Sequence, residues 1–186
     1  MGAFKPLLPF GNKTVIESCL DSLREAGVET IVVVLGHRAD DLRKKLTGVI
    51  FAINPDPDSE MGASIAAAVR ELPDDAAATL IALADHPAVP AAVVSTIIAE
   101  WTQGARIVVP TWQGRGGHPV LVDLSFRREL LNLPASGGLR ALFESHREAV
   151  RRIPVDSPFI ARDMDTWDDY RALHEEATGK PAPPRN

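Results

Sequence analysis

The residues best suited to chemistry are carboxylates that follow short apolar runs. Asp85 comes directly after the apolar run of residues 80–84, and His86 and Pro87 follow it. A short, uniformly apolar run is typical of a strand buried on both faces of a parallel sheet. Pro87 removes a backbone donor and biases His86 away from the helical region, so the strand should end there. Asp85 is then either a cap of the next turn or a ligand-binding residue at the carboxyl edge of the sheet.

A second group of acids lies near the C-terminal end of the chain. Asp163 and Asp165 are far from Asp85 in sequence, but a sheet could bring all three to one rim. Two carboxylates plus phosphate oxygens commonly hold Mg²⁺, which keeps several waters and prefers oxygen ligands. Lys5 lies in an N-terminal loop rich in Gly and Pro, where its ammonium group could neutralise a phosphate. These residue types favour magnesium-dependent chemistry on a phosphorylated ligand.

Composition narrows the class of protein. The 186 residues are enough for one well-buried domain, and 45% hydrophobic with 24% charged residues is ordinary for a soluble globular protein. The net charge of −5 argues against a broad nucleic-acid or membrane footprint. The single cysteine, Cys19, cannot form an internal disulfide, and its place in an amphipathic segment favours a buried apolar role. Without a signal-peptide pattern or a bilayer-spanning apolar run, we expect a cytoplasmic protein.

Strand-like and helix-like segments alternate along the chain. This alternation is typical of an α/β fold in which helices cover both faces of a mostly parallel sheet. We therefore expect one domain over residues 1–177 and a disordered, Pro-rich tail over residues 178–186. Strands are predicted at 30–35, 49–53, 79–84, 106–110, 118–122 and 149–155, and helices at 14–26, 39–46, 63–71, 90–103, 124–132, 138–145 and 166–177.

Five short motifs occur in order over nearly the whole chain. They are M-G-x-x-K-x-L-L-P at residues 1–9, N-P through M-G-x-S at 54–64, L-x-D-x-P at 83–87, P-T-x-x-G-R-x-G-H-P at 110–119 and D-M-D-T-x-x-D at 163–169. Together they resemble the motifs of the molybdenum-cofactor nucleotidyltransferases, the MobA/MocA-like family. The fourth motif is similar to the block of its cytidylyltransferase branch. Each motif alone has low specificity, and their shared order gives the resemblance its weight.

The resemblance implies a fold and a reaction. The fold is a Rossmann-like three-layer α/β/α domain of the nucleotide-diphospho-sugar transferase type. The reaction transfers CMP from CTP to the terminal phosphate of molybdopterin cofactor and releases pyrophosphate. The resemblance implies that Asp85 is catalytic and holds Mg²⁺, with Asp163 or Asp165 completing the metal shell. Lys5 would act in catalysis by stabilising phosphate charge, and Gly2 would contact the nucleotide phosphates.

The same resemblance implies an acceptor side of the site. Asn54 and Ser64 lie in the motif that matches the family's substrate-side loop. Arg115, Gly117 and His118 lie in the fourth motif, where they would shape the acceptor pocket. His118 also fits a hydrogen-bonded turn residue without a ligand role.

The chain departs from the family pattern in two places. It begins at the Met-Gly that in the family follows a strand and a Gly-rich loop, and that loop cradles the triphosphate. We expect this central strand to be missing and its two neighbours to have unpaired backbone edges, from either a mis-assigned start or a truncated form. Ser136 replaces an Asp that the family often carries, which leaves the acceptor's identity open.

Several functions therefore stay open. The first is the magnesium-dependent cytidylyltransferase, and a close alternative uses GTP or another phosphorylated acceptor in the same fold. Because the phosphate loop is missing, a non-catalytic relative could instead bind the cofactor and deliver it to a molybdoenzyme or its maturation chaperone. An inert truncated domain is the remaining alternative. None of these functions requires nucleic acid or a membrane.

Overall fold

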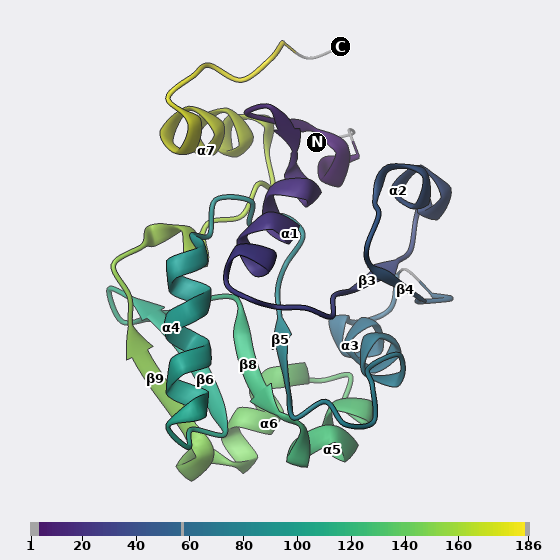
Figure 1. Ribbon diagram of the computed structural model, residues 1–186, viewed down its shortest axis with the longest axis vertical. Helices are drawn as coiled ribbons and strands as arrows, with labels where there is room; N and C mark the ends of the chain where they lie inside the picture. The colour runs from purple at the N-terminus through teal and green to yellow at the C-terminus, as the bar shows by residue number, and fades with distance from the viewer. Residues whose placement is uncertain (1–3, 57, 185–186) are drawn as a thin grey trace.

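Helices and strands alternate along the chain, as predicted (Figure 1). The computed structural model describes residues 4–56 and 58–184, so Gly2 and the last two residues of the predicted tail lie outside the described ranges. The helices are α1 (Val15–Glu25), α2 (Ala39–Lys45), α3 (Met61–Arg70), α4 (Ala91–Thr102), α5 (Arg127–Leu131), α6 (Gly138–Ser145) and α7 (Trp167–Thr178). The strands are β1 (Pro9–Phe10), β2 (Lys13–Thr14), β3 (Val32–Leu35), β4 (Ile50–Ile53), β5 (Ala78–Ile81), β6 (Ile107–Trp112), β7 (Arg115–Gly116), β8 (Val120–Asp123) and β9 (Val150–Pro154).

Five strands form the larger sheet, in the order β5-β8-β6-β7 with β9 paired to β6. β8 runs antiparallel to both β5 and β6, whereas β9 runs parallel to β6. The α/β class is confirmed, but the larger sheet is mixed where a mostly parallel one was predicted. The reason is that the chain returns from β6 through the short antiparallel strand β7 directly into β8, without a helical crossover.

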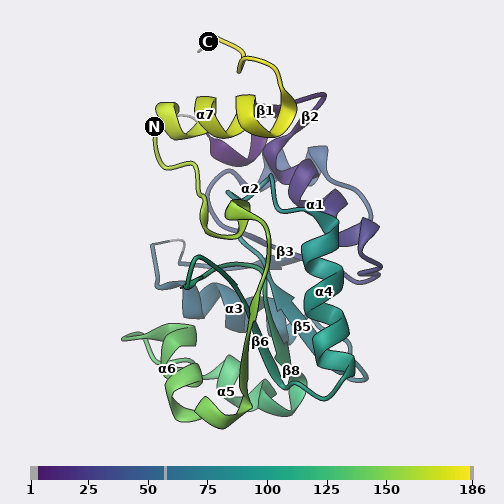
Figure 2. The same cartoon turned by 90° about the vertical axis from the view of Figure 1, so that its left-hand side faces the viewer.

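Helices cover both faces of the larger sheet (Figure 2). Because side chains alternate along a strand, Val108 of β6 and Leu121 of β8 face α4, whose Ile97 is fully buried. The adjacent residues in these strands, Val109 and Val120, face the opposite layer of α3, α5 and α6. This second layer of helices forms one wall of the cavity described below.

The strand that leads to Asp85 is shorter and less buried than predicted. β5 ends at Ile81, which pairs with Val120 of β8, and residues 82–84 form no ladder. Pro119 precedes Val120 and has no backbone N–H, so the antiparallel ladder cannot continue past this pair. All four residues of β5 are only half-buried, because β5 lies at the border of the sheet.

The remaining parallel strands, β3 and β4, form a separate two-stranded sheet. Leu35 and Leu42 pack there with Leu20 of α1. Within the described residues, no strand pairs with the second edge of β3 or with the outer edge of β5. Both of these strand edges are therefore open in the part of the chain that the structure describes.

The two ends of the described chain pack together (Figure 1). Tyr170 of α7 is buried with Phe10 of β1, and its hydroxyl donates to the carbonyl oxygen of Pro9 at 2.6 Å. Helix α7 begins with a capping box in which Thr166 and Asp169 satisfy each other's backbone amides. The same packing carries the residues before α7 to the N-terminal loop. Among the described residues, no helix is long and apolar enough to cross a bilayer.

Candidate active site

Asp85 lies in a turn that other parts of the chain hold in place. The backbone N–H of His86 donates to the carbonyl oxygen of Leu83 at 3.3 Å, and Ser18 of α1 donates its hydroxyl to the carbonyl of Pro87 at 2.8 Å. The Asp85 side chain remains 31% exposed, and its Oδ1 is 3.8 Å from Nε2 of His86. A carboxylate on a fixed turn with one side open to solvent is suited to bind a cation.

The buried His86 and the half-buried His118 lie near this carboxylate. The rings of His86 and His118 meet edge to face, with centroids 6.2 Å apart. Burial lowers the pKa of both imidazoles, and the nearby Asp85 carboxylate only partly opposes this shift. Nδ1 of His118 is 3.1 Å from the carbonyl oxygen of Ile81, so the neutral ring donates Nδ1–H there. Neutral imidazoles next to Asp85 add no positive charge that would repel a metal ion.

The predicted C-terminal acids divide between two positions. The Asp163 carboxylate, like that of Asp85, partly opposes the burial that lowers the pKa of His86. Asp165 instead forms an ion pair with Lys5, whose Nζ lies 2.7 Å from Oδ1 of the carboxylate. Lys5 belongs to the 3₁₀ turn η1 (Lys5–Leu7), which α7 and its preceding residues approach. The structure thus places Asp85 and Asp163 near His86 and pairs Lys5 with Asp165.

The carboxylates fit part of a magnesium site. In the described ranges, no group of three or more His, Cys, Asp or Glu side chains could by itself hold a metal ion. Magnesium, however, keeps several waters and takes one or two protein carboxylates together with substrate phosphates. Asp85 and Asp163 are oxygen donors near His86 that such a metal could use, and their role as ligands stays a prediction.

The loop after β4 is organised by Asn54. Its amide nitrogen donates to the hydroxyls of Ser59 and Ser64, each at 3.0 Å, and its Oδ1 accepts from the backbone N–H of Asp56. Asn54 is buried. These contacts use its polar atoms to shape the loop before α3, and an acceptor contact by Asn54 or Ser64 stays a prediction.

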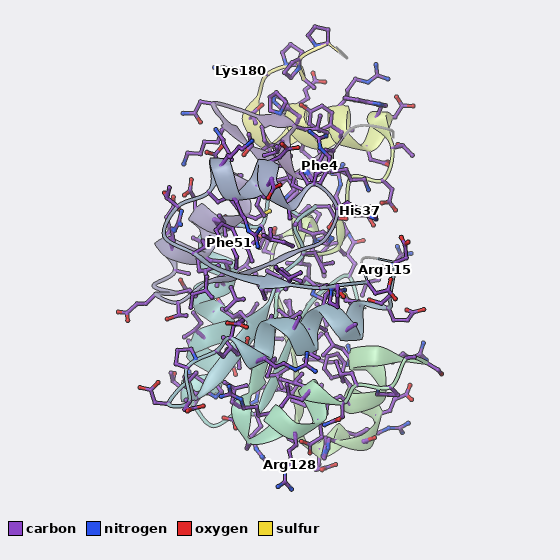
Figure 3. All side chains as sticks on the ribbon, turned by 90° about the vertical axis from the view of Figure 1, so that its right-hand side faces the viewer. Phe4, His37, Phe51, Arg115, Arg128 and Lys180 are labelled. Carbon is purple, nitrogen blue, oxygen red and sulfur yellow. The ribbon has the colours of Figure 1, made fainter. Side chains whose placement is uncertain are left out.

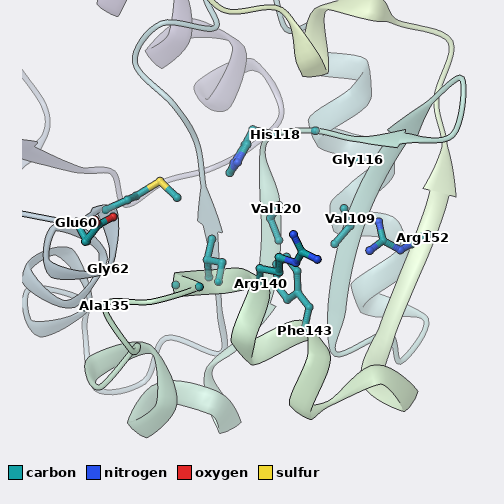
Figure 4. A pocket seen from close by; sticks show the side chains of 15 residues that line it. Glu60, Gly62, Val109, Gly116, His118, Val120, Ala135, Arg140, Phe143 and Arg152 are labelled. Atoms are coloured by element: carbon teal, nitrogen blue, oxygen red, sulfur yellow. The ribbon is translucent and has the colours of Figure 1, made fainter.

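A cavity of about 470 Å³ lies between the larger sheet and the second layer of helices (Figure 4). Its wall begins at His118, beside Asp85, and continues along Val109 and Val120 to α6. Gly117 lines the cavity and Arg115 does not, and an acceptor role for either residue stays a prediction. Arg115 lies at the surface on β7 (Figure 3). The lining residues are Glu60, Met61, Gly62, Val109, Gly116, Gly117, His118, Val120, Ala135, Gly137, Gly138, Leu139, Arg140, Phe143 and Arg152.

Gly117 has a packing role that the sequence did not indicate. A Cβ atom at this position would lie 2.2 Å from the carbonyl oxygen of Ile160, in the 3₁₀ turn η4 (Pro158–Ala161). That same oxygen accepts a hydrogen bond from the backbone N–H of His118 at 2.8 Å. The absence of a side chain therefore lets the loop that carries His118 join the turn that leads to Asp163.

Two lining residues on the far wall were missed from the sequence. Phe143 reads there as an ordinary apolar position of a helix, and Arg152 as one of two consecutive arginines in a strand. The period of two in a strand could have indicated that Arg151 and Arg152 face opposite sides. Only the position of β9 in the sheet tells which of them reaches the cavity.

Comparisons with known proteins agree with this fold. The chain is 30% identical to Rv0371c from Mycobacterium tuberculosis, over 94% of this chain and 90% of that one, with a TM-score of 0.83. A structure of Rv0371c in complex with manganese matches with a TM-score of 0.78. A nucleotidyl transferase from Methanothermobacter, Mth528, is 26% identical over 92% of this chain and 84% of its own, with a TM-score of 0.79.

A curated relative with a different name also matches. The nicotine blue oxidoreductase of Paenarthrobacter nicotinovorans is 27% identical over 91% of this chain and 87% of its own. The sequence pattern of the MobA-like NTP transferase domain matches residues 1–150, which include Lys5, Asp85 and the whole fourth motif. The chain therefore belongs to the MobA-like NTP transferase family, which confirms the resemblance drawn from its five motifs.

Proposed function

We propose that this protein transfers CMP from CTP to the terminal phosphate of molybdopterin cofactor, with a divalent metal at Asp85 and Asp163. The observation that carries the proposal is the pair of carboxylates beside a neutral, buried His86, next to the cavity that begins at His118. The carboxylates mark where nucleotide phosphates would be held. The cavity marks where an acceptor would approach them.

The reaction needs positioning and charge neutralisation more than a protein nucleophile. An oxygen of the acceptor phosphate attacks the α-phosphorus of CTP, and a new phosphoanhydride forms. The bond between the α- and β-phosphates breaks, and its electron pair leaves with pyrophosphate. A bound Mg²⁺ would supply neutralisation of the phosphate charge. Asp85, on its fixed turn, would hold this metal ion near the cavity that begins at His118.

Lys5 and Asp165 have a separate role in this proposal. Their ion pair is partly exposed, at 29% for Lys5 and 70% for Asp165, and such pairs contribute only about 0–1 kcal/mol. A phosphate, with more charge than one carboxylate, can therefore replace Asp165 as the partner of Lys5. This favours Asp163 over Asp165 as the second metal ligand. Asp165 then keeps Lys5 near the site until the nucleotide binds.

The test measures pyrophosphate release with molybdopterin cofactor, Mg²⁺ or Mn²⁺, and either CTP or GTP. Asp85→Asn should lower the rate by at least a hundredfold, because it removes one of two charged metal ligands. Asp74→Asn, in an exposed turn away from the site, is the matched control and should keep the wild-type rate. Equal rates for Asp85→Asn and Asp74→Asn would refute the role of Asp85 as a metal ligand. A higher rate with GTP than with CTP would transfer the proposal to the guanylyl reaction.

Calorimetry separates the enzyme from a delivery protein. Cofactor binding without CTP binding would replace the transferase proposal with the non-catalytic alternative.

The relative from Paenarthrobacter supports a second candidate, reduction of a planar conjugated compound. The apolar walls of the cavity suit such a substrate. Loss of the visible absorbance of nicotine blue with a reduced nicotinamide cofactor would support it. Unchanged absorbance would exclude it.

A further inference from the structure

We propose that the end of the large cavity remote from Asp85 is an anion subsite, in which Arg152 and Arg140 recognise an anionic group on a ligand with a planar, apolar body. The inference deepens the proposed function, because it names the class of acceptor that the cavity takes. The acceptor would present one phosphate to the metal end and a second negatively charged group to the arginines. Its planar body would lie between them.

The first support is the position of Arg152 in the sheet. Arg152 pairs with Val109 of β6, and the preceding Arg151 pairs with Val108. Val109 faces the second layer of helices and lines the cavity, so its neighbour Arg152 projects to the same side. Arg151 projects to the opposite side and forms an ion pair with Glu100 of α4 at 2.8 Å. Two adjacent arginines thus have different surroundings.

The second support is that no acidic partner of the Arg152 guanidinium occurs in the part of the chain that the structure describes. Among the described residues, no carboxylate forms an ion pair with Arg152, and no protein acceptor hydrogen-bonds to it. Its Nη1 lies 3.3 Å from the point where a Cβ of Gly116 would stand, so the group lies against β7 at the cavity wall. A planar guanidinium with free N–H groups beside a cavity is suited to bind phosphate or carboxylate in a bidentate manner.

Arg140 adds a second, partly engaged cation. Its Nε is 3.0 Å from Oε1 of Glu144 one turn later in α6, and both side chains are largely exposed. Such a pair contributes little and leaves the outer N–H groups of the guanidinium free for a ligand. Figure 4 shows Arg140 and Phe143 below His118, with Arg152 on the right-hand wall and Glu60 across the cavity. Glu60 is the acidic side chain that lines the cavity, and it comes from the α3 wall.

The surface between the arginines and His118 is apolar. Val109, Val120, Leu139 and Phe143 supply aliphatic and aromatic groups, and the volume of about 470 Å³ is typical of a small-molecule site. An aromatic or conjugated ring would bury apolar area against this surface. An anionic substituent would then satisfy Arg152. The cavity therefore selects ligands that combine both features.

The test uses 1-naphthyl phosphate as the probe, titrated by calorimetry against the full chain without nucleotide or metal. Arg152→Gln should raise the dissociation constant about tenfold, which is the effect of about 1.4 kcal/mol. Arg151→Gln is the matched control, because it removes the neighbouring charge on the other face, and it should keep the wild-type value. Uncharged 1-naphthol should bind at least tenfold more weakly than the phosphate.

Two results would overturn the inference. One is equal binding of 1-naphthyl phosphate by Arg152→Gln and Arg151→Gln, and the other is equal binding of 1-naphthol and 1-naphthyl phosphate. Failure of the proposed function is distinguishable, since the probe experiment needs neither CTP nor metal. Probe binding that depends on Arg152, in a protein that releases no pyrophosphate, keeps the subsite and removes the transferase. Pyrophosphate release with unchanged probe binding in Arg152→Gln does the reverse.

Discussion

Replacing Gly117 with alanine tests whether the loop that carries His118 packs closely against η4. The new Cβ would stand 2.2 Å from the oxygen, 2.6 Å from the carbon and 2.8 Å from Cβ of Ile160. Real Cβ atoms almost never come within 3.0 Å of another heavy atom, so the loop or η4 must move by most of an ångström. Because two of the three close atoms are backbone, no rotamer change can relieve the contact.

The energetic effect follows from two contributions. Overpacking of this kind destabilises a protein by about 1–3 kcal/mol. Movement of η4 also weakens the 2.8 Å hydrogen bond from the His118 N–H to the Ile160 oxygen, worth about 1 kcal/mol. Gly117→Ala should therefore lower the free energy of unfolding by about 2–4 kcal/mol. In a chain of this size, that corresponds to a drop in Tm of roughly 5–15 °C.

Gly116→Ala is the matched control, one residue earlier in the chain. Its Cβ would stand 3.3 Å from Nη1 of Arg152 and 3.3 Å from Cγ1 of Val109, and the end of an arginine can move aside. We expect a change within about 1 kcal/mol. Urea denaturation followed by circular dichroism measures both variants. Equal stability of Gly117→Ala and Gly116→Ala would show that the loop and η4 are not in close contact, and the account of Gly117 would be wrong.

Three further predictions concern residues around this frame. Burial raises the pKa of Cys19 to about 12. A thiol-specific disulfide reagent at pH 8 should therefore react slowly with the native protein and quickly with the protein in urea. Fast reaction of the native protein would contradict the burial of this thiol. Arg127 donates three hydrogen bonds to carbonyls at and beyond the end of α3, so Arg127→Met should lower the free energy of unfolding by about 2 kcal/mol. Arg128 lies beside it at the surface (Figure 3), and Arg128→Met should change the free energy of unfolding little. Equal losses of stability in the two variants would refute the capping role of Arg127. Burial opposes ionisation of Asp123, but hydrogen bonds from Ser125 and the Trp101 indole lower its pKa overall. The stability that Asp123 contributes is present above the unfolded pKa of about 4 and is lost as pH falls through the lower folded pKa. In urea titrations, Asp123→Ala should therefore destabilise the protein at pH 7 and progressively less below pH 4. A loss of stability that does not depend on pH would contradict this prediction.

Local signals in the sequence correctly indicated much of the fold. Helices were predicted to begin at Thr14 and Thr166, and in the structure each threonine forms a capping box with an acid three residues later. The amphipathic spacing around Cys19 predicted a buried position, and the residue is half-buried in α1. These features depend on residues within one or two turns of each other, so the order of the amino acids is sufficient to determine them.

The candidate site was only partly predictable. The motifs named Asp85, Asp163, Asp165 and Lys5, but not how they would pair. The Lys5–Asp165 ion pair joins residues 160 positions apart, and it exists because α7 packs on the N-terminal hairpin through Tyr170. The same holds for the contact between Gly117 and Ile160, which no local pattern indicates.

The stretch that ends at Asp85 shows where the sequence by itself stops and the tertiary structure decides. The apolar run and Pro87 determined that a strand leads to an acid and that the chain turns there. Pairing with β8 decided that the strand is antiparallel, half-buried and ends at Ile81, because Pro119 on the partner strand lacks the N–H that would extend the ladder. Likewise, the sequence determined that Arg151 and Arg152 face opposite ways. The register of β9 on β6 decided which of them meets Glu100 and which meets the cavity, since the partner of a strand lies far away in the chain.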